Sequence, residues 1–166
     1  MVKVHADLPP LPLRPRAWQW LQWYGVRVVV KDPHSTRGGG LWWPDKKLVE
    51  LETAQEEAAI HELAHAWWEE QRKNVSVRTT FSEMVRRLSQ ETDSRSRRAA
   101  GLAYVYEHGD PNTGFKGMFQ PDGTIIDWEQ YAGLASGIMG QPALLPPYIR
   151  GFYTELFDFD NNGEGN

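Results

Sequence analysis

The chain has 166 residues, enough for one domain with its own hydrophobic core, and its 40% apolar and 24% charged content is ordinary for a globular protein. A net charge of −4 without a long basic run argues against a nucleic-acid partner. The absence of cysteine excludes disulfides, thiolate metal sites and a cysteine nucleophile.

The N-terminus lacks the apolar segment of a signal peptide, and no apolar run approaches the length of a membrane span. We therefore expect a cytoplasmic protein without a membrane partner. No oligomeric state is predicted.

The first elements alternate between helix and strand. Residues 1–15 are rich in proline and predict an extended arm, in which Pro15 is suited to be the first residue of a helix. Arg16–Tyr24 has helical spacing of aromatic residues, and Gly25 is a suitable stop. The β-branched run Val26–Val30 predicts a strand.

A hairpin is predicted immediately before the next helix. Leu41–Trp43 and Leu48–Leu51 are short apolar segments on either side of the turn sequence Pro44–Lys47. The apolar strand is either an ordinary member of a sheet or an edge that offers unpaired backbone groups to an extended peptide. The sequence favours neither interpretation.

The most informative segment is His-Glu-Leu-Ala-His at residues 61–65, in a predicted helix over Ala54–Lys73. Four residues apart on a helix, His61 and His65 lie on the same face and can reach one metal ion. Neutral imidazole is a good zinc ligand, and Glu62 between them is placed to act as a general base. The H-E-x-x-H pattern therefore predicts two zinc ligands and a catalytic carboxylate.

The surroundings of the motif support a helix. Thr53 to Glu56 has the pattern of a capping box, which predicts a helix start one turn before the motif. An apolar stripe made of Ile60, Leu63, Ala64 and Trp67 predicts packing on a core. The alternative is two ordinary histidines on an amphipathic helix, and the intact motif favours a metal site instead.

The second half of the chain is predicted to be mainly helical. Asn74–Thr80 is interpreted as a connector, and a second capping box at Thr80–Glu83 predicts a helix that runs towards His108 and breaks within Gln90–Ser96. Gly109–Gly123 has the composition of a loop. The last two predicted helices span Trp128–Met139, with a start signal at Asp127, and Pro146–Phe157.

Two histidines do not complete a catalytic zinc site, which needs a third protein ligand. The acidic and histidine residues after the motif helix are candidates: Glu83, Glu91, Asp93, Glu107, His108, Asp127 and Glu129. Glu129 fits best because it lies in the first turn of a helix, where the dipole favours a carboxylate. That helix also has a small-residue face, which suits close packing against the motif helix.

The motif helix followed by a helix reading Glu129-Gln-Tyr-Ala-Gly-Leu-Ala resembles the gluzincin class of zinc metallopeptidases. It is similar to small zincins and to the anthrax-lethal-factor-like branch, mainly over residues 40–70 and 127–157. The resemblance implies an α+β, zincin-like fold, in which a small mixed or antiparallel sheet packs on the H-E-x-x-H helix and further helices follow. It also implies that His61, His65 and Glu129 bind Zn²⁺ and that Glu62 is the catalytic base.

The chain departs from that branch in two places. A tyrosine expected seven residues before the third ligand is replaced by Asp122, and a second glutamate is replaced by Gly133. The residue that stabilises the transition state therefore stays open among Tyr106, His108, Tyr148 and Tyr153. For the other ring nitrogens of the histidines, Asp127 or Glu91 would be suitable acceptors.

We expect a single zincin-like domain over residues 1–157 that hydrolyses peptide bonds in a peptide or protein substrate. The alternative is a zincin-fold binding or regulatory module with a structural metal or lost activity. Residues 158–166 open like an EF-hand calcium loop, but the chain ends before the glutamate at position twelve. A flexible acidic tail is therefore the favoured interpretation.

Overall fold

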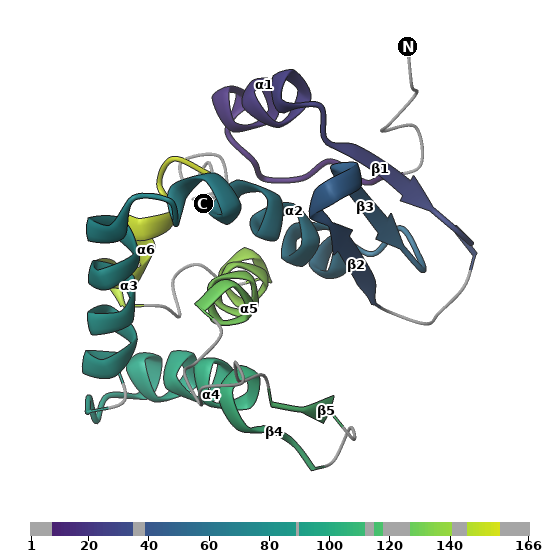
Figure 1. Ribbon diagram of the computed structural model, residues 1–166. Helices are drawn as coiled ribbons and strands as arrows, with labels where there is room; N and C mark the ends of the chain where they lie inside the picture. Colours follow the sequence, from purple (N-terminus) through teal and green to yellow (C-terminus); the bar gives the residue numbers. More distant parts are fainter. Residues whose placement is uncertain are drawn as a thin grey trace, which may run out of the picture.

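The computed structural model describes residues 8–34, 39–88, 90–111, 115–117, 127–140 and 146–156. These residues form an α+β structure with six α-helices, a three-stranded mixed sheet and a two-stranded hairpin (Figure 1). The predicted class, a small mixed sheet on the motif helix with further helices after it, is confirmed at this level. None of the helices in the described ranges is long and apolar enough to cross a membrane.

The predicted first helix and first strand are confirmed. Helix α1 (Pro15–Tyr24) begins at a proline, whose fixed φ and missing N–H suit the first helical position. It ends at Gly25, whose φ of 90° is readily available only to glycine. Strand β1 (Arg27–Val30) follows directly, and before α1 the arm is tied to the C-terminal region by a hydrogen bond from the Arg14 N–H to the Leu156 carbonyl.

The sheet has the order β1-β3-β2, so β2 lies at an edge. Strands β2 (Gly40–Trp43) and β3 (Leu48–Leu51) form the predicted antiparallel hairpin around a 3₁₀ turn, η1 (Pro44–Lys46). Strand β3 also pairs in parallel with β1, which makes the sheet mixed. Both β2 and β3 contact the motif helix, so the sheet holds that helix from one side.

The motif helix α2 spans Glu56–Gln71, and the predicted capping box before it is wrong. Gln55 is the N-cap residue and makes no side-chain cap bond, and the helix begins at Glu56, two residues later than a cap at Thr53 would place it. The Thr53 hydroxyl, which would have capped the helix, is instead buried without a hydrogen-bond partner in the described part of the chain.

The next two helices are α3 (Val75–Leu88) and α4 (Ser94–His108). The interpretation of Asn74–Thr80 as a connector is wrong, because the Asn74 side chain accepts the Ser76 N–H and starts α3 there. Thr80, the predicted cap, lies inside α3 and donates its hydroxyl to the Ser76 carbonyl. The predicted break is confirmed, and Asp93 caps α4 by accepting the Ser96 N–H.

The segment predicted as a loop after α4 contains a short hairpin of β4 (Gly109–Asp110) and β5 (Phe115–Lys116). Helix α5 (Asp127–Gly140) starts at the predicted residue. The predicted aromatic helix is shorter than expected: α6 covers Pro147–Arg150 and passes into a 3₁₀ turn, η3 (Gly151–Tyr153). Residues 158–166, and with them the EF-hand-like opening, lie outside the described residues.

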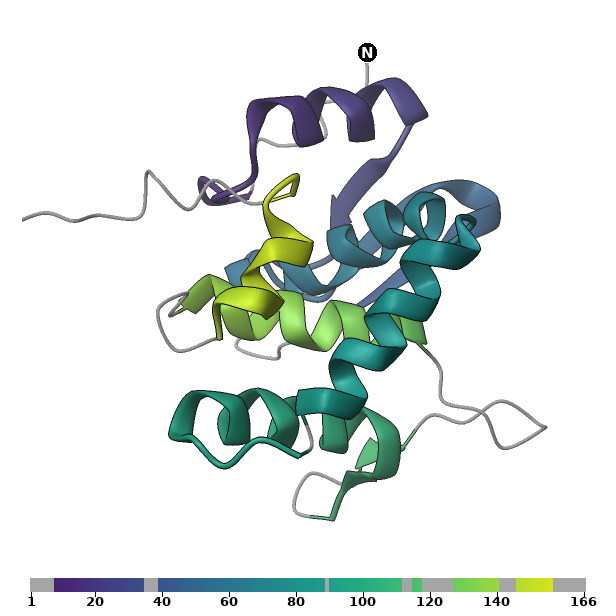
Figure 2. The same ribbon diagram turned by 90° about the vertical axis from the view of Figure 1, so that its left-hand side faces the viewer.

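Helix α5 is the centre of the helical part. It packs between α2 and α4, with α6 alongside it (Figure 1, Figure 2). Buried aromatic rings join these helices: Trp68 of α2 stacks on Tyr131 of α5, and Tyr131 stacks on Tyr153. This packing fixes how the first turn of α5 faces the motif on α2.

Candidate metal centre

Two imidazoles and one carboxylate converge where α2 meets α5. The Nε2 atom of His61 lies 3.5 Å from Oε2 of Glu129, and the Nε2 atom of His65 lies 3.3 Å from Oε1 of the same residue. Among the described residues, these three side chains form the group whose ligand atoms all lie within 4.8 Å of one another. The candidate third ligand preferred from sequence is thus the one that the fold brings to the histidines.

The spacing of these atoms suits a shared metal ion. Tetrahedral ligands with bonds of about 2.0–2.1 Å to zinc lie about 3.3–3.4 Å from one another. A direct charge-assisted N–H···O⁻ bond is shorter, at about 2.7–2.9 Å. The observed 3.3 and 3.5 Å, each to a different oxygen of Glu129, are close to the spacing of neighbouring zinc ligands and longer than a direct charge-assisted bond. Imidazole nitrogen and carboxylate oxygen are also the donors that zinc accepts.

Glu62 lies on the side of the motif helix that faces Gly40 of the edge strand, and it is 6% exposed. Burial raises the pKa of its carboxyl, although His65 and His61 and a backbone hydrogen bond from Trp42 act in the opposite direction. Gly40 of β2 makes this close approach possible: a Cβ atom at that position would lie 2.8 Å from Cγ of Glu62. The sheet edge therefore sets the position of the predicted base.

The pKa of the Glu129 carboxyl is shifted in the opposite direction from that of Glu62. Its burial acts to raise the pKa, but its interactions with His61 and His65 outweigh that effect and lower the pKa to about 2. Glu129 is therefore an anion at neutral pH, as a metal-binding carboxylate must be.

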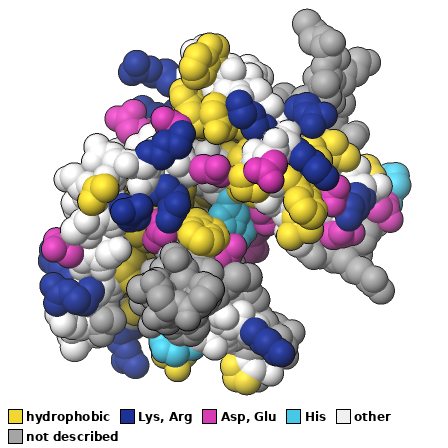
Figure 3. Space-filling model, in the orientation of Figure 1, with side chains coloured by type: hydrophobic (Ala, Val, Ile, Leu, Met, Phe, Trp, Pro, Cys, Tyr) yellow, Lys and Arg dark blue, Asp and Glu magenta, His cyan; other side chains and the backbone are white. Residues whose placement is uncertain are grey.

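These residues line a pocket of about 680 Å³ between β2, α2 and α5. Besides the three converging residues and Glu62, the lining consists of Gly39, Gly40, Leu41, Trp42, Pro44, Glu69, Arg72 and Trp128. In the space-filling view, histidine appears near the middle of the face, with acidic and hydrophobic side chains around it (Figure 3). The volume of the pocket is within the range of pockets that bind small ligands and peptide side chains.

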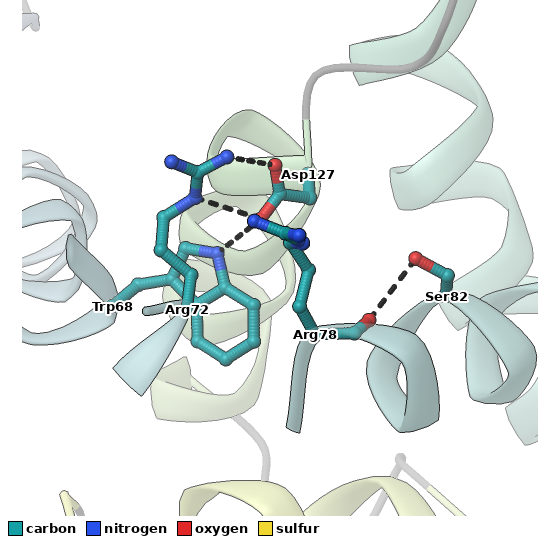
Figure 4. Close-up of polar contacts among 5 residues, drawn as sticks. All are labelled: Trp68, Arg72, Arg78, Ser82 and Asp127. Atoms are coloured by element: carbon teal, nitrogen blue, oxygen red, sulfur yellow. Dashed lines mark hydrogen bonds and ion pairs between the residues drawn. The ribbon is translucent and has the colours of Figure 1, made fainter. Parts of the chain in front are cut away.

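A network of hydrogen bonds between Asp127, Arg72 and Trp68, here called the clamp, joins the end of α2 to the start of α5 beside the pocket. Asp127 accepts hydrogen bonds from Nε and Nη2 of Arg72, at 3.0 and 2.9 Å, and from the buried Nε1 of Trp68, at 2.8 Å (Figure 4). Asp127 is two residues before Glu129, so the clamp fixes the start of α5 against the end of α2. Sequence reasoning treated Asp127 as a possible ligand or histidine acceptor, and it missed Arg72 altogether.

The other candidate ligands lie elsewhere or make other interactions. Glu91 pairs with Arg87, and Asp93 caps α4. His108 is exposed and stacks on Tyr104, and Glu83 is exposed on α3. The side chain of Glu107 lies outside the described residues.

The described candidates for transition-state stabilisation do not line the pocket. Tyr148 lies under the Arg87 guanidinium, and the Tyr153 hydroxyl donates to the Tyr131 carbonyl. His108 is on the exposed end of α4. Asp122 and the side chain of Tyr106 lie outside the described residues. Within the described lining, Arg72 is the one positively charged side chain.

Comparison of the chain with protein-family models, curated proteins and solved structures finds no match.

Proposed function

We propose that this protein is a zinc metallopeptidase of the zincin type, in which His61, His65 and Glu129 hold the metal and Glu62 is the general base. The observation that carries the proposal is the approach of one Glu129 carboxylate to both Nε2 atoms, at 3.3 and 3.5 Å. The small mixed sheet against the motif helix is the arrangement that the resemblance to gluzincins implies. The intact H-E-x-x-H motif supplies the chemistry.

The roles of the chain's own residues follow from their surroundings. Zinc, when bound, supplies a Lewis acid and lowers the pKa of a coordinated water towards neutrality. Glu62 accepts the proton of the attacking water and delivers it to the leaving amine. Its burial strengthens it as a proton acceptor, because a raised pKa favours the protonated form.

Strand β2 provides a route for the substrate backbone. It is an edge strand, paired only with β3 within the described residues, and Gly40, Leu41 and Trp42 line the pocket. An extended peptide can add to such an edge through main-chain hydrogen bonds and place one of its carbonyls near Glu62. Of the two interpretations left open by the sequence, this position favours peptide docking.

The second candidate is a binding module with a structural metal or lost activity. It is favoured by one observation: none of the described candidate residues for transition-state stabilisation lines the pocket. Against it stands Glu62, a carboxylate that is 6% exposed and close to two histidines. Burying a carboxylate costs free energy, and a module without chemistry gains nothing from it.

The test is substitution of the base. Glu62→Gln keeps the size of the side chain but removes the proton acceptor, so the variant should bind one zinc and lose cleavage of a peptide library. Glu57→Gln, an exposed change on the same helix, is the matched control and should cleave normally. Cleavage that persists in Glu62→Gln would rule out the proposed mechanism, and a zinc-loaded wild type without any cleavage would favour the module.

A further inference from the structure

One face of α2 carries a row of polar side chains that continues beyond the predicted metal ligands. His61, His65, Glu69 and Arg72 are spaced by four, four and three residues, so they lie above one another on the same helix face. All four line the pocket. Glu69 is therefore slightly more than one helical turn, about 6 Å along the axis, from His65.

The Glu69 carboxylate is held in position but keeps one oxygen available. Its Oε2 atom accepts a hydrogen bond of 2.8 Å from Nε1 of Trp42 on β2. Its Oε1 atom has no hydrogen-bond partner among the described residues. This carboxylate is thus fixed by a tryptophan across the pocket wall, with an acceptor left for a ligand.

The neighbouring cations are already bonded to other carboxylates. Arg72 makes two hydrogen bonds to Asp127, and Lys73 pairs with Glu70 at 2.6 Å. The remaining terminal nitrogen of Arg72 points away from Asp127 (Figure 4), but the charge of the guanidinium is offset by that partner. Glu69 makes no salt bridge within the described part of the chain, although Arg72 and Lys73 lie close enough for their charges to attract it.

With a divalent metal bound, the charges around the pocket would leave an excess of one negative charge. Asp127 pairs with Arg72 and Glu70 with Lys73, and the metal would offset Glu62 and Glu129. Glu69 is the carboxylate that remains, so the potential in this part of the pocket favours a cation.

The rest of the lining suits a long basic side chain. Trp42 and Trp128 are partly buried and line the same pocket as Glu69. Tryptophan surfaces pack against the methylene stem of lysine or arginine, and their faces attract its charged end. The ring of Trp128 already has one guanidinium, that of Arg72, 4.9 Å from its centroid.

We infer that the pocket selects substrates with a positively charged side chain next to the scissile bond, and that Glu69 binds the ammonium or guanidinium group. The inference rests on the proposed function, because it names the substrate class of the same site. In this assignment Glu69 determines specificity and takes no part in the chemical step.

The experiment measures binding separately from cleavage. Three peptide hydroxamates, which differ only in a lysine, norleucine or glutamate side chain beside the hydroxamate, are titrated calorimetrically into the zinc-loaded protein. The lysine compound should bind at least about fivefold more tightly than norleucine, the equivalent of about 1 kcal/mol, and the glutamate compound should bind most weakly. Glu69→Gln keeps an acceptor for Trp42 and should abolish this order.

The matched control is Glu70→Gln, which removes an adjacent carboxylate that does not line the pocket and should leave the order unchanged. Equal binding of the lysine and glutamate compounds, tighter binding of glutamate through Arg72, or no binding of any compound would overturn the inference. Lysine selection that depends on Glu69 in a protein that cleaves no peptide would uphold the inference and reject the proposed function. Cleavage without a charge preference would support the proposed function and reject the inference about Glu69.

Discussion

The Nε2 atom of His65 lies 3.3 Å from Oε1 of Glu129, although the two residues belong to helices that are far apart in the sequence. The contact depends on α5, which packs against α2 through Tyr131 and Trp68. Both side chains are mostly shielded, at 6% and 15% exposed. The predicted metal site is therefore a product of helix packing as much as of the H-E-x-x-H motif.

The approach of β2 to the motif helix gives the first prediction. Gly40→Ala adds a Cβ atom 2.8 Å from Cγ of Glu62 and 2.8 Å from Cδ2 of Leu51, so the base must shift. We expect a loss of about 1–3 kcal/mol of unfolding free energy and a fall in kcat/KM with zinc still bound. Urea unfolding, metal analysis and peptide cleavage measure the three effects.

Gly101→Ala is the matched control for this change. Among the described residues, no atom outside its own turn of α4 lies within 4 Å of a Cβ atom at position 101, and alanine is the better helix former there. This variant should be as stable as the wild type or more stable. Normal activity in Gly40→Ala would show that β2 does not set the position of Glu62.

The clamp between α2 and α5 gives the second prediction. Asp127→Ala leaves the buried Nε1 of Trp68 without its acceptor and Arg72 without its partner. Removal of one member of such a network should cost about 2–4 kcal/mol of unfolding free energy. Since Asp127 is two residues before Glu129, zinc affinity should fall as well. Denaturant unfolding and zinc titration measure both effects.

An exposed ion pair provides the comparison. Lys73→Ala breaks the pair with Glu70, whose side chains are 63% and 44% exposed, and should change stability by less than about 1 kcal/mol. If Asp127→Ala were as mild as Lys73→Ala, the clamp would not be what holds the two helices.

The third prediction concerns pH in the metal-free protein. The pKa of Glu129 is lowered from 4.5 to about 2, so the folded state binds its proton less readily than the unfolded state. The resulting stabilisation, up to roughly 3 kcal/mol, is present above pH 4.5 and is lost as the pH falls towards 2. The difference in unfolding free energy between wild type and Glu129→Gln should shrink over that range. A difference that stays constant from pH 5 to 2.5 would contradict this account.

Local patterns predicted much of the fold. Proline and glycine marked the ends of α1, the β-branched run gave β1, and the turn residues before β3 gave the hairpin. Glu129 was preferred as a ligand candidate because it combines an acidic side chain with a helix start and a small-residue face, and it is the candidate that lies beside His61 and His65. Each of these signals involves residues only a few positions apart, so their spacing in the sequence determines their relative positions on a helix, strand or turn.

The errors came from competing local signals and from contacts between distant residues. Both capping-box patterns were wrong, because Gln55 and Asn74 occupy the N-terminal positions instead of Thr53 and Thr80. The bonds from Arg72 to Asp127 and from Trp42 to Glu69 join elements distant in the sequence. No spacing rule predicts such pairs, since they depend on how helices and sheet pack.

The most direct test of the central claim is the zinc stoichiometry of the purified protein, measured by metal analysis for wild type and Glu129→Ala. We expect one zinc per chain in the wild type and an affinity lowered more than about 100-fold in the variant, with the fold retained. Glu83→Ala, an exposed change on α3, should bind zinc like the wild type. A wild-type protein that binds no zinc under metal-replete conditions, or a Glu129→Ala variant with unchanged affinity, would contradict the proposed metal site.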